Sequence, residues 1–267
     1  MQKKLSLVVA SFALLGLSAC SLLPEKVDET KNWSVTKLYS EAREEMSGQH
    51  YERAVQLFEK LESSYPFGTY AQQAQMEIAY AHYKSGDQAQ ALAAVERFIK
   101  LHPNHANVDY MYYLRGLINF NDQIGFLNFI YTQDPTERDP KATREAFAAF
   151  KQLVDKFPDS KYTPDALARM NYLVNAMAQY EVHVARYYFR REAYLASVNR
   201  AQSAVNDFRD SPAIEEALFI MTRAYDKMGM TDLRDDTMRV FNKNYPNSRF
   251  LTAEGSKAER HWWKFWQ

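Results

Sequence analysis

Few side chains in the 267-residue sequence have the types and spacing that chemistry needs, and the single cysteine, Cys20, is the first of them. It stands in the stretch GLSACSLLPE, residues 16–25, at the end of the only long apolar run. A thiol can be acylated, can bind a metal or can act as a nucleophile. Without a second cysteine, an intramolecular disulfide and a paired-cysteine metal site are both excluded.

The residues before Cys20 favour acylation. Lys3 and Lys4 give a positive start, and residues 5–17 are apolar, small or hydroxyl-bearing, in a run too short to span a bilayer comfortably. This layout predicts a secretory signal peptide. Its end, LSAC at residues 17–20, resembles the bacterial lipobox, in which the thiol receives a diacylglycerol and the chain is cut just before the cysteine.

We therefore expect residues 1–19 to be removed and Cys20 to carry an N-acyl and an S-diacylglycerol lipid, with no other cofactor. The alternative is a small buried cysteine. Ser21 stands where an aspartate would resemble an inner-membrane retention signal, so we expect an anchor at the periplasmic face of the outer membrane. Residues 20–32 contain few large apolar side chains, which predicts a flexible tether.

Two other groups could carry chemistry. His102 and His105 have the spacing of a metal-binding pair, but they flank Pro103 at an expected helix end, which favours a surface or capping role. The stretch ARYYFRRE, residues 185–192, combines basic and aromatic residues as some nucleic-acid sites do, but we expect it to end a helix with its rings in the core. The sequence lacks the motifs of serine hydrolases, zinc proteases and phosphate loops, so we do not expect an enzyme.

Composition and charge narrow the class of protein. Removing residues 1–19 takes two of 33 basic side chains and none of 33 acidic ones, which leaves a formal charge of about −2. That charge indicates neither nucleic acid nor an anionic membrane surface as a partner. Eight glycines and nine prolines are few for a sheet protein with many tight turns, and windows rich in Ala, Glu, Lys, Gln and Arg predict helices.

The predicted helices recur along the sequence as a repeat. Four segments end in an aromatic residue or histidine followed by proline, at Pro66, Pro103, Pro158 and Pro246. In the first three, an alanine lies twelve residues before the proline, and apolar residues follow it at +4 and +7, which is one face of a helix. These sets are Ala54, Phe58 and Leu61; Ala91, Val95 and Phe98; and Ala146, Phe150 and Leu153. The proline marks where each helix must have stopped.

A first helix precedes each of these second helices. Ala42 and Ala79 lie twelve residues before the first two alanines, so the two helices can approach closely, and Gly48 and Gly86 suit the turn between them. Each unit resembles the tetratricopeptide repeat. We expect an all-α, tetratricopeptide-like solenoid of about five helix pairs, whose concave face is lined by the first helices.

The third repeat is interrupted. Its first helix is expected over residues 109–120, with Gly116 as the small contact residue, and its second helix starts near Lys141. The first half of the intervening insertion is too apolar for a solvated linker. We expect Phe126, Phe129 and Tyr131 to pack onto the concave surface, and a disordered loop is the alternative.

The last two repeats are degraded. The fourth places Ala185 in its first helix, Ser197 at the alanine position and Phe208 before the displaced proline. The fifth uses Gly229 as its turn and has Arg234 at the alanine position.

Several segments resemble one protein family more closely than they resemble repeats in general. They are YPFGTYAQQA at 65–74, AYAHYKSGD at 79–87, RFIKLHPNHANVDYMYYLRGL at 97–117 and ERDPKATREAF at 137–147. With the lipobox and the tether, they look like the BamD family, labelled competence lipoproteins in Neisseria-like organisms, over about residues 17–246.

This resemblance implies a lipid-anchored subunit of the machinery that folds and inserts β-barrel proteins into the outer membrane. The implied partners are the POTRA domains of BamA, lipoproteins such as BamC and BamE, and unfolded barrel precursors. The N-terminal repeats, 33–140, would receive the C-terminal strand signal of a precursor. The C-terminal repeats, 141–247, would face the other subunits.

The resemblance also implies particular site residues. Arg200, in SVNRAQ, would pair with an acidic POTRA residue. The substrate groove would offer aromatic rings and one amide, since a strand signal alternates apolar and aromatic residues and ends in a carboxylate. The groove residues are Tyr65, Phe67, Tyr70, Gln73, Tyr80 and Tyr83. For Phe67 and Tyr80, a place in the junction core is the alternative.

The C-terminal tail, 248–267, departs from the enteric relatives by ending in HWWKFWQ. Trp262, Trp263, Phe265 and Trp266 lie close enough to form one helix patch, suited to a membrane interface or a partner groove. Folding back on the fifth repeat is the alternative. A second function also fits the anchor and the solenoid, namely a periplasmic scaffold for cell-wall or DNA-uptake machinery.

Overall fold

The computed structural model describes residues 30–121 and 140–251, and every regular element in these ranges is a helix. Cys20, the insertion with Phe126, Phe129 and Tyr131, and the tryptophan-rich end of the tail lie outside the described residues. The helices are α2 Val35–Ser47, α3 Tyr51–Ser64, α4 Thr69–Ser85, α5 Gln88–Leu101, α6 Val108–Asn121, α7 Pro140–Lys156, α8 Thr163–Arg190, α9 Tyr194–Asp207, α10 Ile214–Lys227, α11 Thr231–Asn244 and the 3₁₀ turn η4 Arg249–Leu251.

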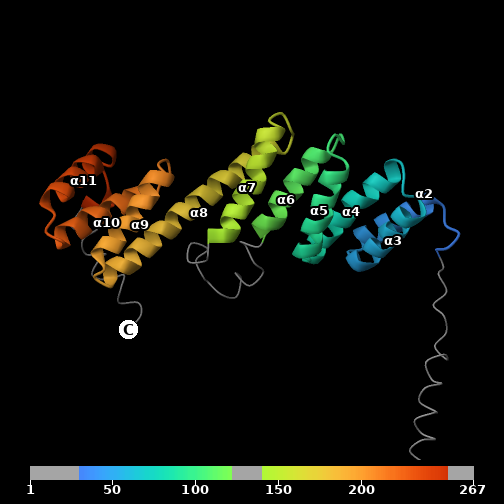
Figure 1. The fold of residues 1–267 in the computed structure, drawn as a ribbon, viewed down its shortest axis with the longest axis horizontal. Coiled ribbons are helices and arrows are strands. Elements are labelled where there is room, and N and C mark those ends of the chain that lie inside the picture. The colour runs from blue at the N-terminus through green and yellow to red at the C-terminus, as the bar shows by residue number, and fades with distance from the viewer. Residues whose placement is uncertain (1–29, 122–139, 252–267) are drawn as a thin grey trace, which may run out of the picture.

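The α-helices of these two ranges form five pairs, from α2 with α3 to α10 with α11, and each helix packs mainly against its neighbours in the chain. Figure 1 shows the pairs side by side in one elongated row. Within the described ranges, the predicted helical-repeat solenoid of about five pairs is confirmed. None of the described helices is long and apolar enough to cross a membrane.

The core of the row consists of the helix faces that the repeat predicts. Ala54, Ala91 and Ala146 are fully buried, and so are the residues at +4 and +7 in each set. Each of these second helices ends before its proline: α3 at Ser64, α5 at Leu101 and α7 at Lys156. The register taken from alanine and proline spacing is therefore correct.

Close packing between paired helices is clearest in the third and fourth repeats. A Cβ added to Gly116 would lie 2.3 Å from Cε1 of Phe150, so α6 and α7 approach as closely as glycine permits. In the fourth repeat, the buried hydroxyl of Ser197 donates a hydrogen bond of 2.8 Å to the carbonyl of Ala185. Both predicted pairings are thus observed.

Gly48, Gly86 and Gly229 each lie in the turn between the two helices of a pair. Gly86 and Gly229 have φ of 82° and 71°, the left-handed region that favours glycine. Gly48 does not, because its φ is −75° and the next residue, Gln49, takes the left-handed conformation at 63°. Gly48 nevertheless lies in the turn between α2 and α3, as expected, directly after the last residue of α2.

α8 is twice as long as most of the other helices, with 28 residues. Pro164 lies in its first turn, where proline is tolerated, and no glycine or proline follows before Arg190. Ala166 and Leu173 pack in the core of α6 and α7, whereas Val182 and Ala185 pack in the core of α9, α10 and α11. That residues 33–140 face the precursor and residues 141–247 face the other subunits stays a prediction.

Candidate functional site

The first helix of the second repeat positions most of the predicted groove residues. α4 starts after Gly68, whose φ of 96° turns the chain between α3 and α4. Tyr70, Gln73, Glu77 and Tyr80 follow at intervals of three, four and three residues, so they share one face of the helix. Gln73 is exposed, and the two rings are partly buried.

The two aromatic residues of the α3–α4 junction differ in their surroundings. The hydroxyl of Tyr65 donates to the carbonyl of Trp33 at 3.0 Å and so ties the junction to the residues before α2. Phe67 is 91% exposed. Phe67 therefore does not pack in the junction core, whereas Tyr80 packs against the cores of the first and second repeats.

Tyrosine rings continue from α4 along the neighbouring first helices. Tyr39 of α2 meets Tyr70 with ring centroids 5.3 Å apart, and Tyr80 lies 6.2 Å from Tyr83. In α6, burial and the nearby rings of Tyr80 and Tyr83, with Glu77 and Tyr162, raise the pKa of Tyr110. We call this set the tyrosine face. Its members are Tyr39, Tyr70, Tyr80, Tyr83, Tyr110, Tyr113 and Tyr162.

At the end of the tyrosine face next to α8, a hydrogen bond fixes Tyr113. The ring of Tyr162 stacks on Tyr113 at 4.8 Å, and the Tyr113 hydroxyl donates to Asp165 Oδ2 at 2.7 Å. Burial and this hydrogen bond raise the pKa of Tyr113 to about 12. Burial opposes ionisation of Asp165, but the hydrogen bonds from Arg169 and Tyr113 outweigh it and lower the pKa of the carboxyl. The Tyr113 hydroxyl is therefore held as a hydrogen-bond donor to an ionised carboxylate.

An ion pair lies at the other end of the tyrosine face, between α2 and α4. Arg43 of α2 donates from Nη1 to Oε1 of Glu77 at 2.5 Å, and its side chain is 54% exposed. Since Arg43 follows Tyr39 by four residues, both lie on one face of α2. A guanidinium has five N–H donors, so this contact leaves Arg43 able to meet a second acceptor.

The histidine pair takes the capping role that the sequence favoured. His102 follows the last residue of α5 and its Nε2 lies 2.9 Å from Oε1 of Gln75, while both histidine rings lean on Phe98 at about 5 Å. The ring centroids of His102 and His105 are 6.5 Å apart. In the described ranges, no three His, Cys, Asp or Glu side chains are placed to hold a metal ion.

Arg200, the predicted partner-binding residue, already has an internal partner. Its Nη1 lies 3.2 Å from Oε2 of Glu181, across the α8–α9 pair. The Glu181 side chain is only 10% exposed, and that of Arg200 is 45% exposed. Arg200 therefore neutralises a nearly buried carboxylate and still presents part of its guanidinium to solvent.

The basic and aromatic stretch at residues 185–192 ends α8 as expected, at Arg190. Phe189 packs against the C-terminal core, but Tyr187 is 43% exposed, so only part of the stretch lies in the core.

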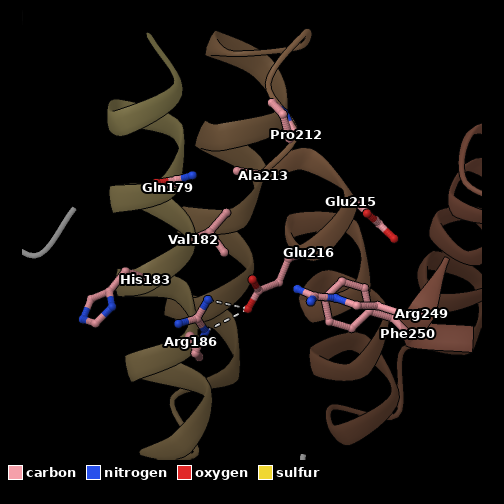
Figure 2. A pocket seen from close by; sticks show the side chains of 10 residues that line it. All are labelled: Gln179, Val182, His183, Arg186, Pro212, Ala213, Glu215, Glu216, Arg249 and Phe250. Carbon is pink, nitrogen blue, oxygen red and sulfur yellow. Dashed lines mark hydrogen bonds and ion pairs between the residues drawn. The ribbon is translucent and has the colours of Figure 1, made fainter. Parts of the chain in front are cut away.

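A cavity of about 430 Å³ lies between α8, the start of α10 and η4 (Figure 2). Arg186 bonds Glu216 through Nε at 2.8 Å and through Nη2 at 2.6 Å, and the Arg249 guanidinium lies over the ring of Phe250 at 5.0 Å. Glu215 lines the cavity as well. Acidic and basic side chains both face this space, so its charge does not select a ligand of one sign.

Most of the groove residues implied by the resemblance lie on α4, and their neighbours on other helices were not predicted. No sequence motif singles out Tyr39, Arg43, Tyr110 or Tyr162. Their spacing offered a signal, since Tyr39 with Arg43 and Tyr110 with Tyr113 recur at three or four residues on first helices. Glu77 could have been found in the same way on α4.

A family model described as YfiO: Outer membrane lipoprotein matches residues 31–241. Among curated relatives, the outer membrane protein assembly factor BamD of Neisseria meningitidis serogroup A is 47% identical over 255 residues, covering 94% of this chain and 96% of the relative. The protein of the same name from Vibrio cholerae serotype O1 is 37% identical, covering 87% and 95%. That of Haemophilus influenzae is 33% identical, covering 88% and 90%.

A solved structure of kinesin light chain TPR-like repeats covers 80% of this chain at 14% identity, with a TM-score of 0.37. That score is too low to support an argument about the fold or the function.

Proposed function

We propose that this chain, which belongs to the BamD family of outer membrane protein assembly factors, is a lipid-anchored, non-catalytic scaffold that receives unfolded β-barrel precursors and holds them at the assembly machinery. The observation that carries the proposal is the relation to BamD proteins over nearly the whole chain. The tyrosine face supports it, because it offers rings on consecutive first helices that an extended chain can cross.

The precursor end is proposed to bind along the tyrosine face. Alternate side chains of an extended strand point the same way, so neighbouring rings can take every second residue of the strand. Phe67, which is 91% exposed, adds an apolar contact at the start of α4. The strand's terminal carboxylate would meet Arg43, which offers charge as well as donors, or Gln73.

Replacing Phe67 with alanine should weaken binding of a barrel C-terminal peptide by about 1.5–3 kcal/mol, the range for burying such a ring. The free energy of unfolding should not change, because the ring packs on nothing now. Isothermal titration with a synthetic peptide measures the affinity, and chemical denaturation measures the free energy of unfolding. Leu195→Ala is the matched control, since Leu195 is 62% exposed on α9. Equal losses for both variants, or none for Phe67→Ala, would contradict the groove.

The carboxylate contact has its own test. Arg43→Gln should lower affinity for a peptide with a free C-terminal carboxylate and leave affinity for the C-terminal amide of the same peptide unchanged. A parent protein that binds both peptides equally would rule out recognition of the carboxylate.

The anchor is proposed at Cys20. Cys20→Ala should abolish acylation and leave the precursor uncleaved, because the thiol is the acceptor of the lipid. Mass spectrometry of the intact protein and separation of inner and outer membranes measure both. Ser21→Ala is the control and should keep the lipid and the outer-membrane location. A lipidated, outer-membrane Cys20→Ala protein would refute this site.

The proposed partners at the C-terminal repeats are the POTRA domains of BamA and lipoproteins of the BamC and BamE type. Arg200 is the proposed contact. Depletion of the protein from cells should reduce folded barrel proteins in the outer membrane, measured by heat-modifiable mobility on gels. Normal barrel proteins with defective DNA uptake or wall integrity would favour the alternative scaffold instead.

A further inference from the structure

A carboxylate lies within the tyrosine face. Glu77 of α4 follows Gln73 by four residues and precedes Tyr80 by three, so all three share one face of the helix. The Glu77 side chain is 19% exposed. The face is proposed to receive a strand that ends in a carboxylate, so Glu77 carries the same charge as the end of that strand.

The negative charge of Glu77 reaches tyrosine hydroxyls on both neighbouring first helices. Burial raises the pKa of Tyr39 on α2, and the carboxylate of Glu77 raises it further. Burial, then Tyr80, then the same carboxylate raise the pKa of Tyr110 on α6. α4 packs against both of these helices. The charge of Glu77 therefore acts over the part of the face where the strand is proposed to bind.

Glu77 and the strand also share one cation. Arg43 of α2 donates from Nη1 to Oε1 of Glu77 at 2.5 Å, and the Arg43 side chain is 54% exposed. The proposed function sets this guanidinium against the terminal carboxylate of the strand. Glu77 belongs to the same chain as Arg43, so their contact costs no translational freedom, whereas the contact with a strand does. Glu77 therefore meets Arg43 before any strand does.

The pair changes what Arg43 can select. A half-exposed arginine without an acidic neighbour attracts any carboxylate, including acidic side chains with no apolar residues beside them. With Glu77 next to it, Arg43 adds little for a carboxylate alone, and a ligand must also place apolar side chains on the rings. Specificity then depends on an unfavourable contact as well as on favourable ones.

We propose that Glu77 is an internal competitor for the terminal carboxylate of a bound strand and acts through Arg43, which rests on the function proposed above for the tyrosine face. Glu77 lowers the affinity for the strand end and so favours its release.

Glu77→Gln tests the competition, since it keeps the size of the side chain and removes its charge. The probe is a synthetic peptide with apolar or aromatic residues at alternate positions, made with a C-terminal carboxylate and with a C-terminal amide. Isothermal titration of the mature chain with Cys20→Ser measures both affinities. The variant should bind the carboxylate peptide about tenfold more tightly than the parent does, and the amide peptide equally well. No gain for the carboxylate peptide, or the same gain for both peptides, would overturn the proposal.

Glu62→Gln is the matched control. Glu62 pairs with Arg97, and their side chains are 16% and 58% exposed, close to the values for Glu77 and Arg43. Glu62 also accepts a hydrogen bond from Gln75, which lies on the opposite side of α4 from Glu77. The control removes the same charge away from the tyrosine face and should leave both affinities as in the parent. A similar gain in the control would reduce the effect of Glu77 to net charge and refute the competition.

The double variant Arg43→Gln with Glu77→Gln tests whether Glu77 acts through Arg43. In the Arg43→Gln background, Glu77→Gln should raise the affinity for the carboxylate peptide by less than about twofold, because the shared cation is gone. The full gain in that background would mean direct repulsion of the strand and contradict the proposal. Circular dichroism and the melting temperature confirm that each variant is folded.

The preference of the parent protein separates a failure of the competition from a failure of the proposed function. A parent that binds neither peptide, or both equally, would overturn the function proposed for the face and the competition with it. A parent that prefers the carboxylate peptide, together with a Glu77→Gln variant of unchanged affinity, would overturn the competition alone.

Discussion

Replacing Arg200 with alanine should weaken binding of the POTRA domains by about 2–5 kcal/mol, a loss of orders of magnitude in affinity. The proposal sets the exposed part of this guanidinium against a partner carboxylate, which the variant would leave unpaired. Arg200→Lys should recover only part of the loss, since an ammonium cannot donate two parallel hydrogen bonds. Titration of purified POTRA domains against each variant measures this.

The internal pair with Glu181 must be separated from the partner contact. Arg200→Ala leaves a carboxylate of 10% exposure without its cation and should lower the free energy of unfolding by about 1–3 kcal/mol. The double variant Arg200→Ala with Glu181→Gln removes the buried charge and should recover most of that stability.

The double variant decides between two roles. A stable double variant that still fails to bind the POTRA domains supports a partner contact. One that binds as tightly as the parent means that Arg200 serves only Glu181, and that the role implied by the family is wrong at this position.

The second large effect is expected at Gly116. Gly116→Ala adds a Cβ 2.3 Å from the ring of Phe150, which is fully buried and packed between Tyr113 and Phe120. Overpacking at so short a distance should cost about 3 kcal/mol, the upper end of its usual range. Alanine adds roughly 1 kcal/mol over glycine in a helix, so the variant should lose about 2 kcal/mol of stability. Chemical denaturation of the purified protein measures the difference.

Two further variants test the cause. Gly48→Ala should change stability by less than about 0.5 kcal/mol, because its φ is −75° and its nearest neighbour is the movable ring of His50. Phe150→Leu in the Gly116→Ala background should cost less than Phe150→Leu alone, because the smaller side chain makes room for the methyl group. Strictly additive losses would show that the two residues do not clash.

The fold could be predicted because its core obeys a local rule. Alanine and proline positions fix which face of each helix is buried, and that rule needs no knowledge of distant residues. Arg43 and Glu77, by contrast, meet across 34 residues on different repeats, and Arg200 meets Glu181 across two helices. Such pairs depend on how far successive helices are rotated about the row, which spacing within one helix does not determine.

The same limit applies to smaller details of the turns. Gln49, not Gly48, turns left-handed between α2 and α3, because local hydrogen bonds at the helix end choose the residue. His102 and His105 come together because the chain folds back on Phe98 after α5. Both outcomes depend on the backbone conformation of one or two turn residues, which a periodic pattern of helix residues does not determine.

The length of α8 makes it a mechanical link. At 1.5 Å per residue its 28 residues extend about 42 Å as one hydrogen-bonded rod. Its first turns carry Asp165, which holds Tyr113 of the tyrosine face, and its later turns carry Glu181, which holds Arg200. After Pro164 in its first turn, α8 contains no glycine or proline, so nothing in its sequence favours a kink. A tilt of one end of α8 would therefore move the other end as well, without any rearrangement in between.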